Sequence, residues 1–299
     1  MKLDIPAAFA SDITDRNDSA GPAWLRRLPQ VVAELCDRWQ LTPQGPTWFG
    51  YCAIALPVRR ADATPAVLKV SWPGPDQAPE APALRAWDGD GVVRLLDHDP
   101  DRWALLLERL DESRDLTGVP IGEAIQTIGS LLRRMHRATV PANVPSLADT
   151  ARHWAEDIPS RWSVAAPPWP DRVRDEVVVS CRDLGDSEGG RLLHADLHFE
   201  NVLAADREPW LAIDPKGLVG DPAFESSAVL WNRFDEYSGH REVRRRLDAW
   251  CEAADVDRDR AAAWARVRIV EDAVDRLVDA RGDEREIDVH RYLIDALPT

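Results

Sequence analysis

The sequence predicts an α+β fold in which a small antiparallel sheet precedes a mainly helical region. Strand-like runs of apolar residues, separated by polar turns, fill residues 51–110. Apolar residues at helical spacing dominate from residue 120 onward. The chain length allows one large domain or two moderate ones, and the change of pattern divides residues 1–108 from residues 109–299.

The N-terminal part should contain one long helix and two pairs of strands. Residues 1–20 are polar and mixed, which predicts a loose arm, and the apolar positions of Pro22–Trp39 follow helical spacing. The turn sequence RRADATP separates two strands of a hairpin, and two further strands should complete the sheet. The expected strands are Tyr51–Val58, Ala66–Ser71, Gly91–Asp99 and Trp103–Leu110.

The C-terminal part should be helical on both sides of one short strand and a hairpin. Pro120 suits the first position of a strongly amphipathic helix that runs to about Ala138. Two more helices are expected over 147–162 and 171–184, and up to four after Asp221.

Composition and charge exclude several classes of protein. The chain has 299 residues, of which 44% are hydrophobic and 30% charged, and its formal charge is −15. Such an acidic chain lacks the basic face that nucleic-acid binding requires. The sequence has neither a membrane span nor the start of a signal peptide, and its four scattered cysteines favour free thiols and a cytoplasmic location. Nothing in the sequence indicates an oligomeric state.

The stretch His194–Pro215, HADLHFENVLAADREPWLAIDP, carries the clearest chemical signal. The segments VLAA and WLAI should form a hairpin, which returns the chain to its origin and lets Asp196, Asn201 and Asp214 converge. Carboxylate and amide oxygens are hard ligands that suit Mg²⁺, and one remaining carboxylate could accept a proton from a hydroxyl group. These groups are the ones that phosphoryl transfer needs.

Three motifs together resemble a known family. The pattern His-x-Asp-x-x-x-x-Asn before a hairpin that ends in Asp, the string DPKGLVGDPAFE, and the strand AVLKVSWP are similar to aminoglycoside phosphotransferases. Within that family they resemble the streptomycin 6-kinase and hydroxyurea phosphotransferase branch. The resemblance implies a two-lobed, protein-kinase-like fold and ATP-dependent phosphorylation of a small-molecule hydroxyl group with Mg²⁺.

The resemblance also implies a role for each residue that matches a motif. Asp196 would be the catalytic base, and Asn201 and Asp214 would hold the metal. Lys69 would bind the nucleotide phosphates, with Glu80 as its ion-pair partner. His194 should order the loop by hydrogen bonds rather than react.

The resemblance further implies that Leu107–Leu110 form the crossing between the lobes, and that main-chain groups near Glu108 and Leu110 recognise adenine there. The sequence departs from the family pattern at two positions: Ala195 stands where glycine is usual, and Glu225 where aspartate is usual.

Two alternatives from other classes remain open at this stage. His194, Asp196 and His198 could ligate zinc in a metal-dependent hydrolase, although the other histidines lack ligand spacing. The chain could also be a nucleotide-binding protein that has lost catalysis. The retention of Lys69, Asp196 and the metal-binding pair argues against this second alternative.

The charge of the chain suggests the kind of acceptor. A cleft lined by one sign of charge concentrates ligands of the opposite sign, so a chain of charge −15 favours a cationic amino sugar or aminocyclitol. Acidic residues of the C-terminal helices could contact ligand amines, although such residues more often form solvated helix faces. The residues in question are Asp235, Glu236, Glu271 and Asp272.

Overall fold

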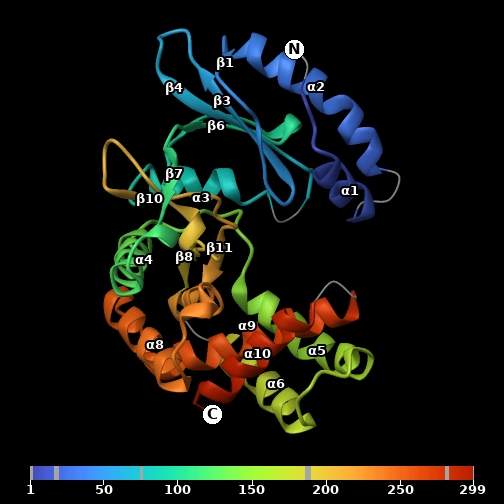
Figure 1. Ribbon diagram of the computed structural model, residues 1–299, viewed down its shortest axis with the longest axis vertical. Helices are drawn as coiled ribbons and strands as arrows, with labels where there is room; N and C mark the ends of the chain where they lie inside the picture. The colour runs from blue at the N-terminus through green and yellow to red at the C-terminus, as the bar shows by residue number, and fades with distance from the viewer. Residues whose placement is uncertain (1–2, 17–19, 75–76, 186–189, 280–282, 299) are drawn as a thin grey trace. The chain divides into compact units, whose positions relative to one another are not determined.

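The computed structural model describes residues 3–16, 20–74, 77–185, 190–279 and 283–298. The chain forms two compact units (Figure 1). Unit 1 comprises residues 1–89 and 93–110, and unit 2 comprises residues 90–92 and 111–299. Unit 1 ends two residues beyond the expected boundary at 108, and a short segment around Val92 belongs to unit 2.

Unit 1 is built on a fully antiparallel six-stranded sheet in the order β1-β3-β4-β6-β5, with β2 paired to β3. This confirms the predicted small antiparallel sheet. The helix α2 lies along one side of the sheet (Figure 1). The elements are β1 Thr42–Pro43, β2 Trp48–Phe49, β3 Ala53–Arg59, β4 Pro65–Ser71, β5 Leu95–Asp99, β6 Ala104–Glu108, α1 Ala7–Arg16, α2 Ala20–Arg38, α3 Glu80–Trp87 and the 3-10 helix Pro100–Arg102.

The expectation of a loose arm over residues 1–20 is wrong, because Ala7–Arg16 forms the helix α1. Phe9 and Ile13 are four residues apart and lie on one helix face, and both are buried in the core of unit 1. The ring of Phe9 also packs against Trp24 and Phe49. The i, i+4 spacing of these two apolar residues was the available signal, but polar neighbours obscured it.

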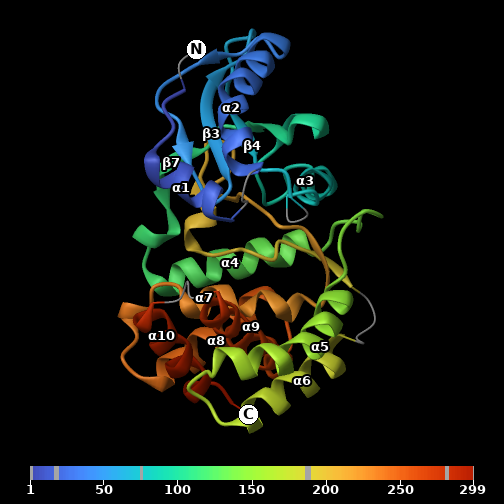
Figure 2. The ribbon, with the colours of Figure 1, turned by 90° about the vertical axis from the view of Figure 1, so that its right-hand side faces the viewer.

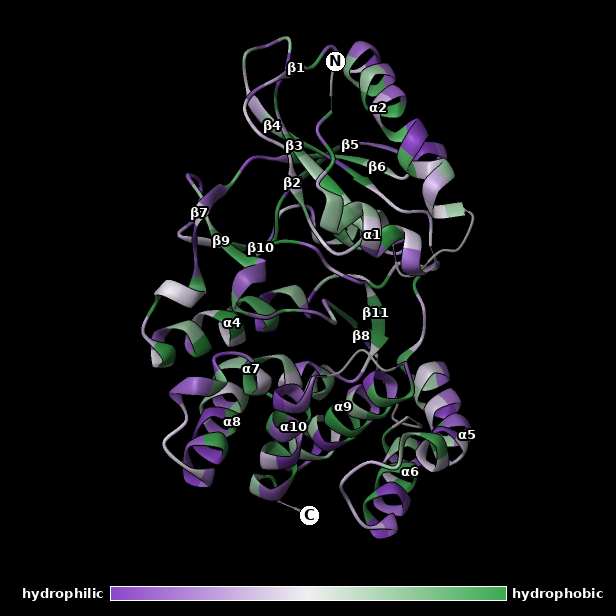
Figure 3. Ribbon diagram, turned by 45° about the vertical axis from the view of Figure 1, so that its right-hand side comes forward, coloured by the Kyte–Doolittle hydropathy of each residue, from purple (hydrophilic) through white to green (hydrophobic). Residues whose placement is uncertain are grey.

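Buried and partly exposed side chains alternate along β4, as expected for a sheet with one face in the core. Ala66, Leu68 and Val70 of β4 point into the core beneath α2, so Lys69 lies on the opposite face of the strand. Figure 3 shows β3, β9 and β11 largely in green, β7 in purple and the helices in mixed colours, as expected for amphipathic helices around an apolar interior.

Unit 2 is mainly helical and confirms the second half of the predicted α+β fold. Two small antiparallel sheets, β10-β9-β7 and β11-β8, carry the candidate site. The strands are β7 Asp111–Asp115, β8 Arg191–Leu193, β9 Val202–Ala204, β10 Trp210–Ala212 and β11 Leu218–Gly220. The α-helices are α4 Ile121–Met135, α5 Leu147–Ala165, α6 Asp171–Gly185, α7 Ala228–Trp231, α8 His240–Ala254, α9 Arg258–Val278 and α10 Glu284–Ala296, and the 3-10 helices are Leu116–Gly118, Phe199–Asn201, Pro222–Ser227 and Phe234–Glu236.

Helices pack closely on one another in unit 2. The helix α9 contacts α5, α6 and α10, as Figure 2 also shows, and α4 contacts α8. Gly129 of α4 lies against Ala253 of α8, where a β-carbon on the glycine would meet the alanine side chain. This close approach explains glycine inside an otherwise regular helix.

The segment after Asp221 is less helical than the sequence predicts. A 3-10 helix, Pro222–Ser227, leads into the short helix α7, which ends where Asn232 becomes extended and Arg233 adopts a φ of 55°. Among the described residues, no helix is long and apolar enough to cross a membrane.

Candidate active site

In unit 1, Lys69 and Glu80 form a buried ion pair. Lys69 lies in the middle of β4, between Ala55 of β3 and Leu105 of β6. Its Nζ lies 2.7 and 2.8 Å from the two carboxylate oxygens of Glu80, the first residue of α3. Only 12% of the lysine side chain and 4% of the glutamate side chain are exposed. The pair therefore holds one ammonium group in a fixed place on the sheet.

In unit 2, His194 is fully buried directly after β8. Its Nδ1 accepts a hydrogen bond from the main-chain N–H of Asp196 at 3.3 Å, so Nε2 carries the proton and donates to the carbonyl of Ile213 at 2.9 Å. Burial lowers the pKa of the imidazole, which favours this neutral form. His194 thus orders the loop, as the sequence suggests.

Glu225 holds the same loop from the other side. Its buried carboxylate accepts hydrogen bonds from two successive main-chain N–H groups, that of His194 at 2.6 Å and that of Ala195 at 3.0 Å. Asp221 caps the 3-10 helix that carries Glu225, and its carboxylate accepts hydrogen bonds from the N–H of Ala223 and from Trp264 Nε1.

Ala195 adopts a φ of 65° in this loop. That conformation suits glycine and costs an alanine roughly 1–2 kcal/mol. The departure from the family pattern noted in the sequence is therefore a strained position, and the two hydrogen bonds to Glu225 help to hold it.

Hydrogen bonds within the loop and the hairpin bring Asp196, Asn201 and Asp214 together. The side-chain Nδ2 of Asn201 donates to the carbonyl of Asp196 at 2.8 Å, which leaves Oδ1 as the remaining acceptor of the amide. The N–H of Ile213, at the end of the β9–β10 hairpin, donates to the carbonyl of Asn201 at 2.9 Å. The hairpin inferred from the sequence is confirmed, and it returns the chain to the loop as expected.

Lys216 completes the cluster, a residue whose place in it was not evident from the sequence. Its Nζ lies 3.7 Å from Oδ2 of Asp196 and 3.7 Å from Oδ2 of Asp214. Both carboxylates therefore surround one ammonium group, and all three side chains are 36–38% exposed. The sequence shows this residue only as the lysine of the DPKG motif.

The residues present fit a magnesium ion. Asn201 Oδ1 and the carboxylate of Asp214 are hard oxygen donors, and Mg²⁺ in nucleotide sites commonly takes one or two protein ligands besides phosphate and water. The zinc alternative does not fit, because both ring nitrogens of His194 already make hydrogen bonds to the main chain. Within the described ranges, no group of three or more His, Cys, Asp or Glu side chains could hold a metal ion.

Glu108 and Leu110 lie at the end of unit 1. The main-chain N–H of Glu108, the last residue of β6, donates to the carbonyl of Arg94 at 2.9 Å. The Glu108 carboxylate accepts from the N–H of Arg94 at 3.1 Å. The Leu110 side chain is buried.

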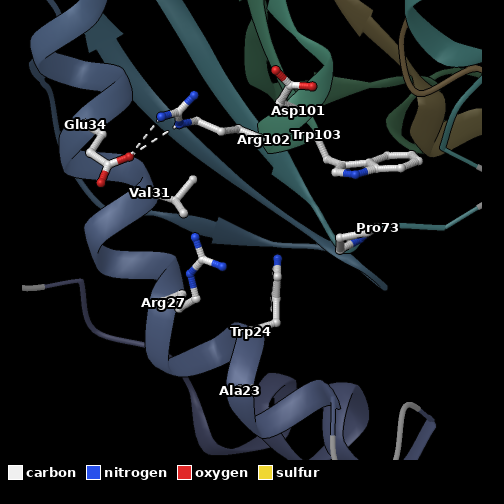
Figure 4. Close-up of a pocket in the computed structure, with 9 residues that line it drawn as sticks. All are labelled: Ala23, Trp24, Arg27, Val31, Glu34, Pro73, Asp101, Arg102 and Trp103. Atoms are coloured by element: carbon white, nitrogen blue, oxygen red, sulfur yellow. Dashed lines mark hydrogen bonds and ion pairs between the residues drawn. The ribbon is translucent and has the colours of Figure 1, made fainter.

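A pocket of about 460 Å³ in unit 1 lies apart from these residues (Figure 4). The helix α2 contributes Trp24, Arg27 and Glu34, while Arg102 and Trp103 close the opposite side. Glu34 and Arg102 are hydrogen-bonded across it at 3.2–3.3 Å. None of the predicted site residues lines this pocket.

The acidic residues near the C-terminus that could contact ligand amines are all paired with arginine. Their carboxylates lie within 2.6–3.2 Å of guanidinium nitrogens, so they are partly neutralised. The pairs are Asp235–Arg285, Glu236–Arg233, Glu271–Arg268 and Asp272–Arg276.

Solved structures identify the class of fold. The aminoglycoside phosphotransferase APH(4)-Ia, in a ternary complex with ADP and hygromycin B, is similar with a TM-score of 0.61 at 15% identity, covering 88% of this chain and 97% of that chain. Choline kinase from Streptococcus pneumoniae is similar with a TM-score of 0.58 at 15% identity, covering 90% and 98%. The fold is that of the kinase-like phosphotransferases.

Sequence comparison identifies the family. The model for "aminoglycoside/hydroxyurea antibiotic resistance kinase" matches residues 38–279. A streptomycin 6-kinase of Streptomyces glaucescens is 40% identical over 277 residues, covering 91% of this chain and 90% of the relative. A hydroxyurea phosphotransferase of Kitasatospora aureofaciens is 38% identical over 297 residues, covering 98% and 86%. The chain belongs to the aminoglycoside/hydroxyurea antibiotic resistance kinase family, and it is a small-molecule kinase.

Proposed function

We propose that this protein transfers the γ-phosphoryl group of ATP to a hydroxyl group of a small, cationic acceptor. The observation that carries the proposal is the joint placement of Asp196, Asn201 and Asp214, which a loop and a hairpin hold together through main-chain hydrogen bonds. The buried Lys69–Glu80 pair of unit 1 supports it independently.

Asp196 is assigned as the catalytic base. The acceptor oxygen forms a bond to the γ-phosphorus while the bond from that phosphorus to the bridging oxygen breaks, and the electron pair leaves with ADP. The proton of the acceptor hydroxyl passes to the Asp196 carboxylate. Positioning of the hydroxyl group contributes a large part of the rate whether proton transfer occurs early or late.

Asn201 and Asp214 are assigned to the metal, and Lys69 to the α- and β-phosphates. Mg²⁺ would supply charge neutralisation at the phosphates when it is bound. The role of Glu80 is to keep the Lys69 ammonium in place, since a buried lysine without a partner would be costly. Adenine is assigned to main-chain groups near Glu108 and Leu110, at the end of unit 1.

The proposed acceptor is a streptomycin-like aminocyclitol. Two streptomycin 6-kinases are 40% identical to this chain, and the formal charge of −15 favours a cationic ligand. The arginine pairs on the C-terminal helices weaken the local attraction, so Asp196, Asp214 and the overall charge must supply it. The hydroxyurea phosphotransferase relative makes neutral hydroxyurea the alternative acceptor.

We place the reaction in the cytoplasm, where ATP is supplied. All four cysteines are free thiols, three of them buried, which agrees with a reducing compartment.

A mass-shift assay tests the proposal. The protein is incubated with ATP, Mg²⁺ and one of streptomycin, other aminoglycosides, simple amino sugars or hydroxyurea, and each product is examined for the addition of a phosphate group. We expect phosphorylated streptomycin. Phosphorylation of hydroxyurea alone would replace the acceptor and keep the kinase, whereas no phosphorylated product from any of these acceptors would contradict the proposal.

A further inference from the structure

Lysine is scarce in this chain, and its placement is not random. The sequence contains 37 Lys and Arg residues, of which three are lysine: Lys2, Lys69 and Lys216. The other basic residues are arginines, including those in the surface ion pairs of the helices. Of the two lysines beyond the N-terminus, Lys69 lies beside Glu80 in unit 1, and Lys216 lies beside Asp196 and Asp214 in unit 2. A lysine presents a compact ammonium charge, whereas an arginine presents a planar guanidinium group.

The main chain at Lys216 is held firmly. Its N–H donates to the carbonyl of His194 at 2.9 Å, and Gly217 turns the chain with a φ of 61°. Leu218 then pairs with Leu193 at the start of the β11–β8 ladder. The residue is therefore fixed to the loop that carries Asp196, while its long side chain remains partly exposed and able to move.

Stability does not explain a lysine at this position. Exposed ion pairs contribute about 0–1 kcal/mol, and each carboxylate that Lys216 contacts is more than a third exposed. The cluster holds two carboxylates for each ammonium, so Lys216 offsets only part of its negative charge. That charge would oppose the approach of a phosphate group.

The place of the ammonium group matches the path of the transferred group. In the proposed function, the phosphoryl group moves from the nucleotide phosphates near Asp214 to the acceptor oxygen near Asp196. Lys216 Nζ lies 3.7 Å from both carboxylates, so it can reach the oxygens of a group that moves between them. Negative charge is spread over these equatorial oxygens in the transition state.

We propose that Lys216 is a further catalytic residue, whose ammonium group donates a hydrogen bond to a non-bridging oxygen of the phosphoryl group during transfer. It makes and breaks no covalent bond and passes no proton. The contribution is electrostatic, and it acts on charge that the transition state presents. This inference rests on the proposed function, because it needs the phosphoryl group to travel to a hydroxyl at Asp196.

Chemical labelling tests the position of Lys216 without any turnover. The probe is an ATP analogue with an acyl group on its γ-phosphate; a nearby lysine amine attacks the acyl carbonyl, becomes acylated and releases ATP. With wild-type protein and Mg²⁺, we expect acylation of Lys216, suppressed by excess ATP and identified by peptide mass spectrometry. Acylation confined to Lys69, or none at either lysine, would overturn the inference about Lys216.

Kinetics test the role. Lys216→Met should lower kcat by about 10²–10³-fold while the KM for ATP changes less than about threefold, because the lost interaction forms only in the transition state. Lys216→Arg should recover part of kcat. Arg245→Met, an exposed charge on α8, is the matched control and should behave as wild type. A wild-type kcat for Lys216→Met would contradict the role.

These outcomes separate the inference from the proposed function. If wild type is active and Asp196→Asn inactive while Lys216→Met remains fully active, only the inference fails. If wild type phosphorylates no acceptor, the proposed function fails. Should Lys216→Met not fold, as judged by circular dichroism, the labelling of wild type decides alone.

Discussion

The buried carboxylate of Glu225 accepts a hydrogen bond from the main-chain N–H of His194 at 2.6 Å, at the base of the loop that carries Asp196. A second bond, to the N–H of Ala195, makes the contact bidentate. The loop geometry at Asp196 therefore depends on a residue that lies some thirty positions later in the chain.

We predict that Glu225→Gln destabilises the protein by about 1–3 kcal/mol, because an amide can accept only one of the two bonds and leaves one buried N–H unsatisfied. Denaturant unfolding measures this, with the exposed Glu252→Gln as control. Activity should fall as well, since Asp196 follows directly. An unchanged unfolding free energy for Glu225→Gln would show that these bonds contribute little.

Ala195→Gly should stabilise the protein by up to about 1 kcal/mol. Glycine relieves a left-handed conformation that costs alanine roughly 1–2 kcal/mol, and its greater freedom in the unfolded chain returns part of that gain. Ala263→Gly, inside α9, is the opposite control and should destabilise by about 1 kcal/mol. An equal loss of unfolding free energy in both variants would mean that Ala195 is unstrained.

Stability should also fall as the pH drops below 6.5, the ordinary pKa of histidine, because burial lowers the pKa of His194 in the folded protein. The unfolded chain then binds a proton that the folded chain does not, which costs at most about 1.4 kcal/mol per pH unit. The contribution of His194 to stability is fully present above pH 6.5 and is lost as the pH falls below this value.

His194→Gln provides the control for this pH effect, because glutamine keeps one donor and one acceptor without titrating. Unfolding free energies at pH 7.5 and pH 5.5 should differ more for wild type than for this variant. The same difference in both proteins would assign the pH dependence to other groups.

The sequence could predict the fold and the hairpin of the candidate site because both depend on local pattern. Strand alternation around Lys69 and the hairpin before Asp214 follow from neighbouring residues, and the structure has them where expected. Glu225 and Lys216 could not be recognised in the same way. Their roles arise from contacts with His194 and Asp196, which lie far away in the chain.

The helix α1 was missed for a related reason. Its stability comes from Phe9 and Ile13 packing onto the core of unit 1, not from a long amphipathic repeat. Among the arginines that neutralise the C-terminal acidic residues, only Arg285 was beyond the sequence, because it meets Asp235 in the folded protein. The other three pairs are three or four residues apart, a spacing that the sequence shows.

Salt should weaken the binding of a cationic acceptor, because this binding depends on attraction to the negatively charged protein. Raising the ionic strength shortens the screening length, which is about 10 Å at 0.1 M, so the KM for streptomycin should rise severalfold between low and high salt. The KM for neutral hydroxyurea, measured in parallel at saturating ATP, should stay constant. A preference for the neutral acceptor without any salt effect would remove the charge argument and leave the kinase assignment intact.

The central claim is that Asp196 acts on the acceptor rather than on the nucleotide. Asp196→Asn keeps the size of the side chain but removes the carboxylate, so phosphate transfer should be nearly abolished while the affinity for Mg²⁺–ATP and the unfolding free energy barely change. The direct measurement is the rate of phosphate transfer to streptomycin by this variant, with ATP binding measured on the same preparation. Transfer lowered by at least about 10²-fold with ATP binding retained is the predicted result; transfer at the wild-type rate would contradict the account.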